Sequence, residues 1–135
     1  MVLKLVSVFS TKLFGEVADL GAGWGYLSKE ALRLNNKITR ITLFENNYSA
    51  YLASKKNIDD ERAIFRWASL ENIRNLRLRF NHVICNPPFH SGPRKDIELL
   101  KSFIFYSSRL INPRGSVWMV FVSGVYLDNE LKEHF

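Results

Sequence analysis

The sequence has 135 residues, of which 47% are apolar, and its 19 basic and 13 acidic residues give a formal net charge of +6. This length suits one core, so we expect residues 1–135 to form a single domain. No apolar run approaches the length of a membrane span and the first residues lack a cleavage pattern, so we expect neither a membrane segment nor a signal peptide. The single cysteine, Cys85, excludes an internal disulfide and is typical of a reducing, cytoplasmic setting.

Apolar patterns along the chain predict strands that alternate with helices. Short apolar runs predict five strands, at residues 14–20, 38–44, 63–67, 80–85 and 116–122. Apolar residues at helical spacing predict helices at residues 24–35, 48–57, 96–110 and 127–134. We expect Asp96 to be the N-cap of the third helix and residues 112–115 to form a turn. The first dozen residues show no clear pattern and receive no assignment.

This alternation predicts an α/β fold, with a Rossmann-like parallel sheet covered by helices on both faces. Right-handed crossovers place the carboxyl ends of all strands at one edge of the sheet. Asp19, Glu45, residues 67–69 and Asn86 lie at such strand ends, so we expect them to meet at this edge. Open α/β sheets bind ligands there, and the convergence therefore predicts a binding site.

A glycine-rich turn, D-L-G-A-G-W-G at residues 19–25, follows the first predicted strand. Such a turn lets a ligand approach the main chain, although it often reflects only tight packing of strand against helix. Glu45 follows 24 residues after Gly21, about where a second strand delivers an acid to ribose hydroxyls. The spacing G-x-G-x-G departs from the dinucleotide pattern, and Asp19 would repel a pyrophosphate but accept from an ammonium group. The pattern therefore favours a ligand that contains an amino acid and a nucleoside.

The second conspicuous stretch is N-P-P-F-H at residues 86–90, directly after a predicted buried strand. Neither proline has an N–H to donate, so the strand cannot continue. An amide side chain, free carbonyls and an aromatic ring are then displayed at the strand end, an arrangement suited to a flat group that bears an amine. The alternative is a simple proline turn after a strand. Cys85 lies inside the strand-like run, so we predict that it is buried and inert.

These two stretches carry a resemblance to a known family. Residues 17–28, V-A-D-L-G-A-G-W-G-Y-L-S, closely resemble motif I of the class I S-adenosylmethionine-dependent methyltransferases. The N-P-P-F-H stretch resembles that of the small-subunit ribosomal RNA guanine-N2 methyltransferases, in the methyltransferase small domain group. The likeness covers residues 14–122 and includes L-I-N-P-R-G at residues 110–115, similar to the family's turn before strand five.

The resemblance implies S-adenosylmethionine as the cofactor, no metal, and a set of site residues. One group of residues is implied to contact the cofactor, at its methionine part, ribose, adenine or methyl group. These residues are Asp19, Gly21, Ala22, Gly23, Glu45, Ala68, Ser69 and Asn86. Those implied to bind the acceptor amine and base are Asn86, Pro87, Pro88 and Phe89. The methyl group is already electrophilic, so the resemblance implies alignment of the amine rather than a general base, and His90 shapes the pocket.

The sequence departs from the family pattern at three places. Ser69 stands where an acid often binds the adenine amine, few residues precede motif I, and no antiparallel strand pair follows residue 122. We therefore expect a fold without its last two strands and an exposed apolar edge at strand 117–122, where a homodimer could form. A truncated or decayed domain is an alternative.

The leading hypothesis is an RNA N-methyltransferase that acts on an exocyclic base amine, guanine N2 of 16S ribosomal RNA. Two basic clusters, at residues 74–79 and 94–95, favour RNA as the partner over a small acceptor, although a merely soluble basic surface fits them equally well. The alternatives are a protein or DNA N-methyltransferase, a non-catalytic module that binds S-adenosylmethionine or RNA, and, third, a dinucleotide-dependent oxidoreductase.

Overall fold

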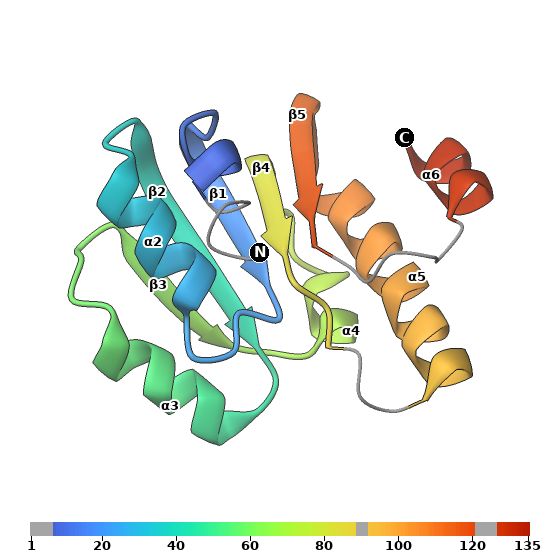
Figure 1. Cartoon of the computed structure of the whole chain (residues 1–135), viewed down its shortest axis with the longest axis horizontal. Helices are drawn as coiled ribbons and strands as arrows, with labels where there is room; N and C mark the ends of the chain where they lie inside the picture. Colours follow the sequence, from blue (N-terminus) through green and yellow to red (C-terminus); the bar gives the residue numbers. More distant parts are fainter. Residues whose placement is uncertain (1–6, 89–91, 121–126) are drawn as a thin grey trace.

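The structure is a computed structural model that describes residues 7–88, 92–120 and 127–135. It contains strands and helices in alternation, as the sequence predicts (Figure 1). The strands are β1 (Gly15–Leu20), β2 (Ile38–Glu45), β3 (Ala63–Trp67), β4 (Phe80–Cys85) and β5 (Ile111–Met119). The helices are α2 (Tyr26–Leu34), α3 (Tyr48–Asn57), α4 (Leu70–Ile73), α5 (Pro93–Leu110) and α6 (Asp128–His134).

The strands form one parallel sheet in the order β3-β2-β1-β4-β5. The register brings their carboxyl ends level, because Leu20 at the end of β1 pairs with both Phe44 and Cys85. The chain moves from β1 to β2 on one side and later returns to β4 on the other, so the direction of winding reverses between β1 and β4. Such a reversal leaves a crevice at the carboxyl edge of the sheet.

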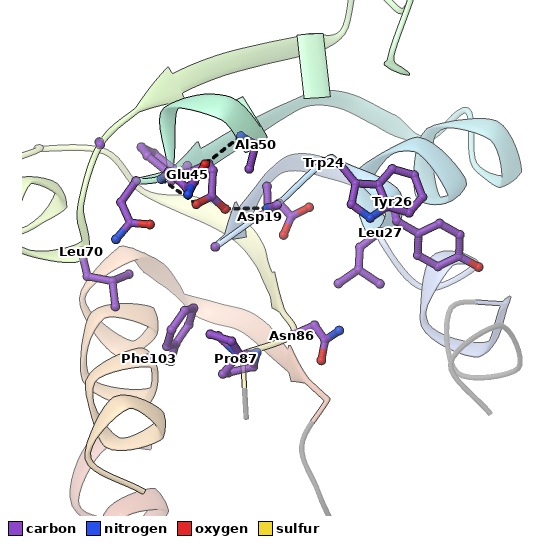
Figure 2. Close-up of a pocket in the computed structure, with 18 of the residues that line it drawn as sticks. Asp19, Trp24, Tyr26, Leu27, Glu45, Ala50, Leu70, Asn86, Pro87 and Phe103 are labelled. Carbon is purple, nitrogen blue, oxygen red and sulfur yellow. Dashed lines mark hydrogen bonds between the residues drawn. The ribbon is translucent and has the colours of Figure 1, made fainter. Parts of the chain in front are cut away.

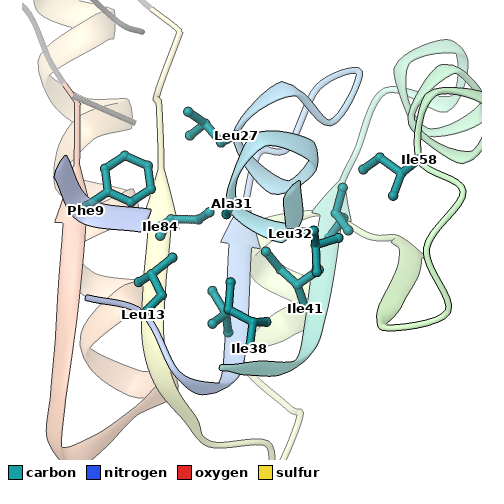
Figure 3. Packing of buried hydrophobic residues seen from close by; sticks show 11 residues of the cluster. Phe9, Leu13, Leu27, Ala31, Leu32, Ile38, Ile41, Ile58 and Ile84 are labelled. Atoms are coloured by element: carbon teal, nitrogen blue, oxygen red, sulfur yellow. The ribbon is translucent and has the colours of Figure 1, made fainter. Parts of the chain in front are cut away.

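One face of the sheet packs against α2 and the segment before β1. Leu27, Ala31 and Leu32 of α2 belong to one buried cluster with strand residues, and Figure 3 shows them beside Ile38, Ile41 and Ile84. These helix residues recur at helical spacing, and the burial of their side chains removes apolar area from water. The apolar spacing in the sequence therefore predicted this helix, although Leu34, the last apolar residue of α2, is exposed.

The opposite face packs against α4 and α5. Phe103 and Leu110 of α5 and Ile73 of α4 join the cluster that contains Val83 and Cys85. Helices therefore cover both faces, which confirms the predicted Rossmann-like α/β fold. Cys85 is fully buried, as predicted.

Two expectations need correction, and one helix was not predicted. Asp96 is not an N-cap, because α5 begins at Pro93 after Gly92, and a proline suits the first helical position, which needs no N–H partner. Residues 112–115 lie within β5 as an irregularity, since Ile111 already pairs with Phe80 before the register resumes at Ser116. Helix α4 was missed because it is a single turn, although Ser69 caps it through Asn72.

The amino edge of the sheet is held by a polar network around Arg62. Its guanidinium donates to the carbonyl oxygens of Leu32, Asn35 and Ile38 at 2.9–3.2 Å and pairs with the Asp60 carboxylate at 2.7 Å. The bonds to Leu32 and Asn35 satisfy carbonyl groups at the end of α2 that lack helical partners, and the bond to Ile38 joins them to the start of β2. Across the part of the chain that the structure describes, no helix is long and apolar enough to span a bilayer.

Candidate functional site

A cavity of about 790 Å³ opens at the carboxyl edge of the sheet, where the sequence predicts a binding site (Figure 2). It has the size of a typical site for a nucleoside-sized ligand. Most of the predicted site residues line it: Asp19, Gly21, Ala22, Gly23, Glu45, Ala68, Asn86, Pro87 and Pro88. Ser69 is not among the lining residues, and Phe89 and His90 lie outside the described residues.

Asp19 is the most unusual polar residue of the cavity. Its side chain is 1% exposed, and one carboxylate oxygen accepts from the Ser28 hydroxyl at 2.6 Å. The other oxygen, Oδ1, is buried without a hydrogen-bond partner among the described residues. A buried polar atom without a partner destabilises the folded chain, and because Asp19 lines the cavity, a donor on a ligand could supply the missing hydrogen bond.

Burial raises the pKa of Asp19 from its ordinary value of 3.8 to about 7. The Ser28 hydroxyl opposes this shift, and the nearby charge of Glu45 adds to it. A cationic group placed beside Oδ1 would favour the ionised form. The carboxylate is therefore suited to an ammonium group.

Glu45 joins the two loops that border the cavity. Its Oε2 accepts from the backbone N–H of Gly23 at 2.6 Å, and its Oε1 accepts from the backbone N–H of Asn47 at 2.9 Å. The sequence places the acid at the end of β2, and these bonds fix its orientation. A carboxylate has about four acceptor positions, so Glu45 keeps capacity for ligand hydroxyls.

The glycine turn brings backbone rather than side chains to the cavity. Gly21 and Gly23 have φ of +66° and +58°, a conformation that strains other residues. A Cβ at Gly21 would lie 2.9 Å from the ring of Phe103, whereas one at Gly23 would meet no atom within 4 Å. Gly21 is therefore required by packing as well as by backbone, and Gly23 leaves open space beside the cavity.

Asn86, Pro87 and Pro88 form the wall that follows β4. Asn86 is exposed, and its side chain makes no hydrogen bond with any described residue. Figure 2 shows Asn86 and Pro87 opposite Glu45, with Phe103 beside Pro87. A free amide oxygen next to a proline carbonyl can accept two N–H bonds from one amine.

Of the two residues predicted to lie beside adenine, Ala68 and Ser69, only Ala68 lines the cavity. The Ser69 hydroxyl bonds Asn72 and caps α4. Sequence reasoning missed the apolar residues that complete the cavity, namely Trp24, Tyr26, Leu27, Phe44, Ala50, Leu70, Ile73, Leu99 and Phe103. Leu70 and Ile73 could have been found from the capping pattern of α4, but Leu99 and Phe103 look like ordinary core residues of α5.

No group of three or more metal-binding side chains occurs within residues 7–88, 92–120 and 127–135. Burial raises the pKa of the Cys85 thiol, so this cysteine is a poor nucleophile. The chemistry of the cavity is therefore that of a buried acid, a second carboxylate and a free amide.

Comparison with known families matches residues 3–135 to the methyltransferase small domain. The chain belongs to this family. The resemblance recognised in the glycine turn and the N-P-P-F-H stretch is thereby confirmed at the level of the family.

One curated relative is ribosomal RNA small subunit methyltransferase C of Buchnera aphidicola. It is 29% identical to this chain over 116 residues, which make up 86% of this chain and 34% of the relative. The chain thus spans about a third of the length of the curated relatives it matches.

Solved structures of methyltransferases share the fold. The 16S rRNA N2 G1207 methyltransferase of T. thermophilus, in complex with AdoMet and guanosine, aligns with a TM-score of 0.81 and 21% identity over 99% of this chain and 37% of that chain. Precorrin-6y C5,15-methyltransferase of Geobacter metallireducens aligns with a TM-score of 0.72 and 20% identity. The alignment covers 98% of this chain and 70% of that chain. At these identities the likeness shows the fold, which methyltransferases with different acceptors share.

Proposed function

We propose that the chain is an S-adenosylmethionine-dependent N-methyltransferase domain that acts on guanine N2 of 16S ribosomal RNA. The observation that carries this proposal is the single cavity that unites Asp19, Glu45 and the Asn86–Pro88 wall. Family membership supports the reaction type, and the names of the relatives support ribosomal RNA as the acceptor. We propose that residues 1–135 act as one such domain in the cytoplasm, where ribosomal subunits are found.

The residues of the cavity fit the two ends of the cofactor. Asp19 Oδ1 would accept from the ammonium of the methionine part, which would supply the partner that this buried oxygen lacks. Glu45 would accept from ribose hydroxyls with its remaining lone pairs, and Ala68 and Ile73, which line the cavity, would form the adenine side. A dinucleotide fits less well, because a pyrophosphate beside the glycine turn would face the charge of Asp19.

When bound, the cofactor supplies a methyl group on a positively charged sulfur. The chain's contribution is to align the acceptor amine with the methyl group. In well-oriented reactions such alignment lowers the activation barrier by about 7 kcal/mol or more. The Asn86 amide oxygen and the Pro87 carbonyl accept the two N–H groups of the amine and stabilise the positive charge that develops on nitrogen during attack. Pro88 keeps the segment extended, and no general base is needed before attack.

The edge of the sheet at β5 supports a further part of the proposal, a homodimer. β5 is the last strand in the sheet order, and its apolar residues Val117, Trp118 and Met119 are only partly buried. Unpaired strand edges associate readily with a second chain. Sedimentation of the purified chain should show a dimer, and a monomer at high concentration would contradict this part.

Calorimetric titration tests the cofactor first. We expect S-adenosylmethionine to bind at micromolar strength, about −8 kcal/mol, and NADH to show no heat. Transfer of a labelled methyl group to 16S ribosomal RNA, free or in the small subunit, then tests the acceptor. Mass spectrometry of digested RNA should locate the label on guanine N2.

The two assays separate the alternatives. Binding of the cofactor without transfer to any RNA would favour a non-catalytic module. Transfer to DNA or protein but not RNA would contradict the assigned acceptor. Binding of NADH in place of S-adenosylmethionine would overturn the cofactor.

A further inference from the structure

A second cavity, of about 660 Å³, lies apart from the carboxyl-edge site. It is enclosed by the segment that joins α4 to β4 and by the last turn of α5. Four arginines line it: Arg74, Arg77, Arg79 and Arg109. Tyr106 and Asn75 add uncharged hydrogen-bond donors, and no acidic residue is among the lining residues.

The local sequence explains why two of these arginines, Arg77 and Arg79, face outward. Leu76 and Leu78 pack against the core cluster of α5 and β4, so the extended segment presents alternate residues to solvent. Arg77 and Arg79 lie on the exposed side of this alternation. The packing of the two leucines thus fixes the backbone that carries the charges.

Only three arginines elsewhere in the described chain have carboxylate partners, whereas Arg66, Arg94 and Arg114, like the four cavity arginines, form no ion pair with a described residue. The paired arginines are Arg33 with Glu30, Arg40 with Glu16 and Arg62 with Asp60. No carboxylate of the described residues lies within ion-pair distance of the cavity arginines. Arg79 donates to the carbonyl of Leu78, and the Arg109 guanidinium lies 5.3 Å from the ring centre of Phe105. Four like charges gathered without a counter-charge repel one another, so an anion would stabilise them.

The cavity is close to the proposed catalytic site. Ile73 of α4 lines both cavities, so the two cavities meet at the single turn of α4. A polymer that entered one cavity would therefore pass near the other.

We propose that this four-arginine cavity binds backbone phosphates of the RNA strand whose base is methylated. The proposal rests on the proposed function for its choice of RNA as the polyanion. Guanidinium groups bind phosphate oxygens through paired N–H bonds, and the Tyr106 hydroxyl and Asn75 amide can bind further oxygens. The site adds affinity without base selectivity, and it positions the strand beside the catalytic cavity.

The test compares two double variants with the same loss of charge. Arg74→Gln/Arg77→Gln removes two cavity arginines, and Arg33→Gln/Arg40→Gln removes two arginines that pair with carboxylates elsewhere. Binding of a fluorescent single-stranded RNA is measured by anisotropy over a range of salt concentrations. We expect the cavity variant to bind at least about tenfold more weakly, with a salt slope reduced by roughly 1.4, because each neutralised phosphate contributes roughly 0.7. We expect a change below about threefold in the control.

Equal weakening in both double variants would overturn the site, since only net charge would then matter. Tighter binding of poly-glutamate than of RNA would also overturn it, as would a nucleoside diphosphate that binds as tightly as the RNA. RNA binding requires no methyl transfer, so failure of the catalytic assay alone leaves this test intact. Calorimetry with S-adenosylmethionine on both variants shows that the folded cofactor site persists.

Discussion

Two polar regions at opposite edges of the sheet are built in opposite ways. At the amino edge, Arg62 donates to three backbone carbonyls and pairs with Asp60. At the carboxyl edge, Asp19 is buried with one oxygen unpartnered, and the Asn86 amide is free of described partners. The first region satisfies hydrogen bonds within the chain, whereas the second keeps them for a ligand.

This difference shows that the carboxyl edge, unlike the amino edge, contains groups that lower the stability of the folded chain. A buried carboxylate without a full set of donors destabilises the folded chain, and such groups persist at functional sites. Substitutions at the amino edge should therefore change stability, and those at the carboxyl edge should change binding or transfer.

The largest effect is expected for Asn86→Ala. Loss of the amide oxygen removes an acceptor for the amine in the transition state, so methyl transfer should fall about 100-fold or more. The affinity for S-adenosylmethionine should be nearly unchanged by calorimetry, because Asp19 and Glu45 remain. Equal loss of binding and transfer would contradict the role assigned to Asn86.

Asp19→Asn should separate binding from stability. The amide has the shape of the carboxylate but lacks its charge, so affinity for S-adenosylmethionine should fall roughly 30-fold. Without ligand, the variant should be more stable than the parent at about pH 8, by about 2 kcal/mol, because a buried charge is removed.

The size of that stability difference depends on pH. The pKa of Asp19 is 3.8 ordinarily and about 7 in the folded chain, so the folded state holds a proton that the unfolded state has lost between these values. The parent therefore loses stability as pH rises through this window. Urea unfolding should show the advantage of Asp19→Asn shrinking as pH falls toward 4, and an advantage independent of pH would refute the assignment.

Arg62→Met tests the amino edge. The variant keeps much of the side-chain volume but leaves three carbonyls without their donor, and unfolding free energy should fall by about 1.5 kcal/mol. Arg40→Met is the control, because the Arg40–Glu16 pair is exposed and 3.7 Å long, and its loss should change stability by less than about 0.5 kcal/mol. Similar effects in both variants would show that the Arg62 network has no special role.

The smallest expected effect is the pH dependence of cofactor affinity. An ammonium ligand requires ionised Asp19, so affinity should fall by up to about tenfold for each pH unit below about 7. Calorimetry between about pH 6 and about pH 8 measures this, and in Asp19→Asn the dependence should disappear. A parent affinity that stays constant across this range would show that the ammonium does not lie beside Asp19.

The sequence by itself determined the alternation of strands and helices, the edge where the site lies, and most of its polar residues. Such features are local, because periodicity, glycine and proline act on the backbone of neighbouring residues. The single-turn helix α4 and the start of α5 at Pro93 were missed, because short helices and proline-rich starts carry weak periodic signals.

Only the tertiary structure decided the state of those residues and their companions. Burial raised the pKa of Asp19, Phe103 of α5 came to face Gly21, and Arg109 joined the arginines of residues 74–79. These results depend on which distant side chains pack together and how much water they exclude. That is a property of the assembled core rather than of any single segment.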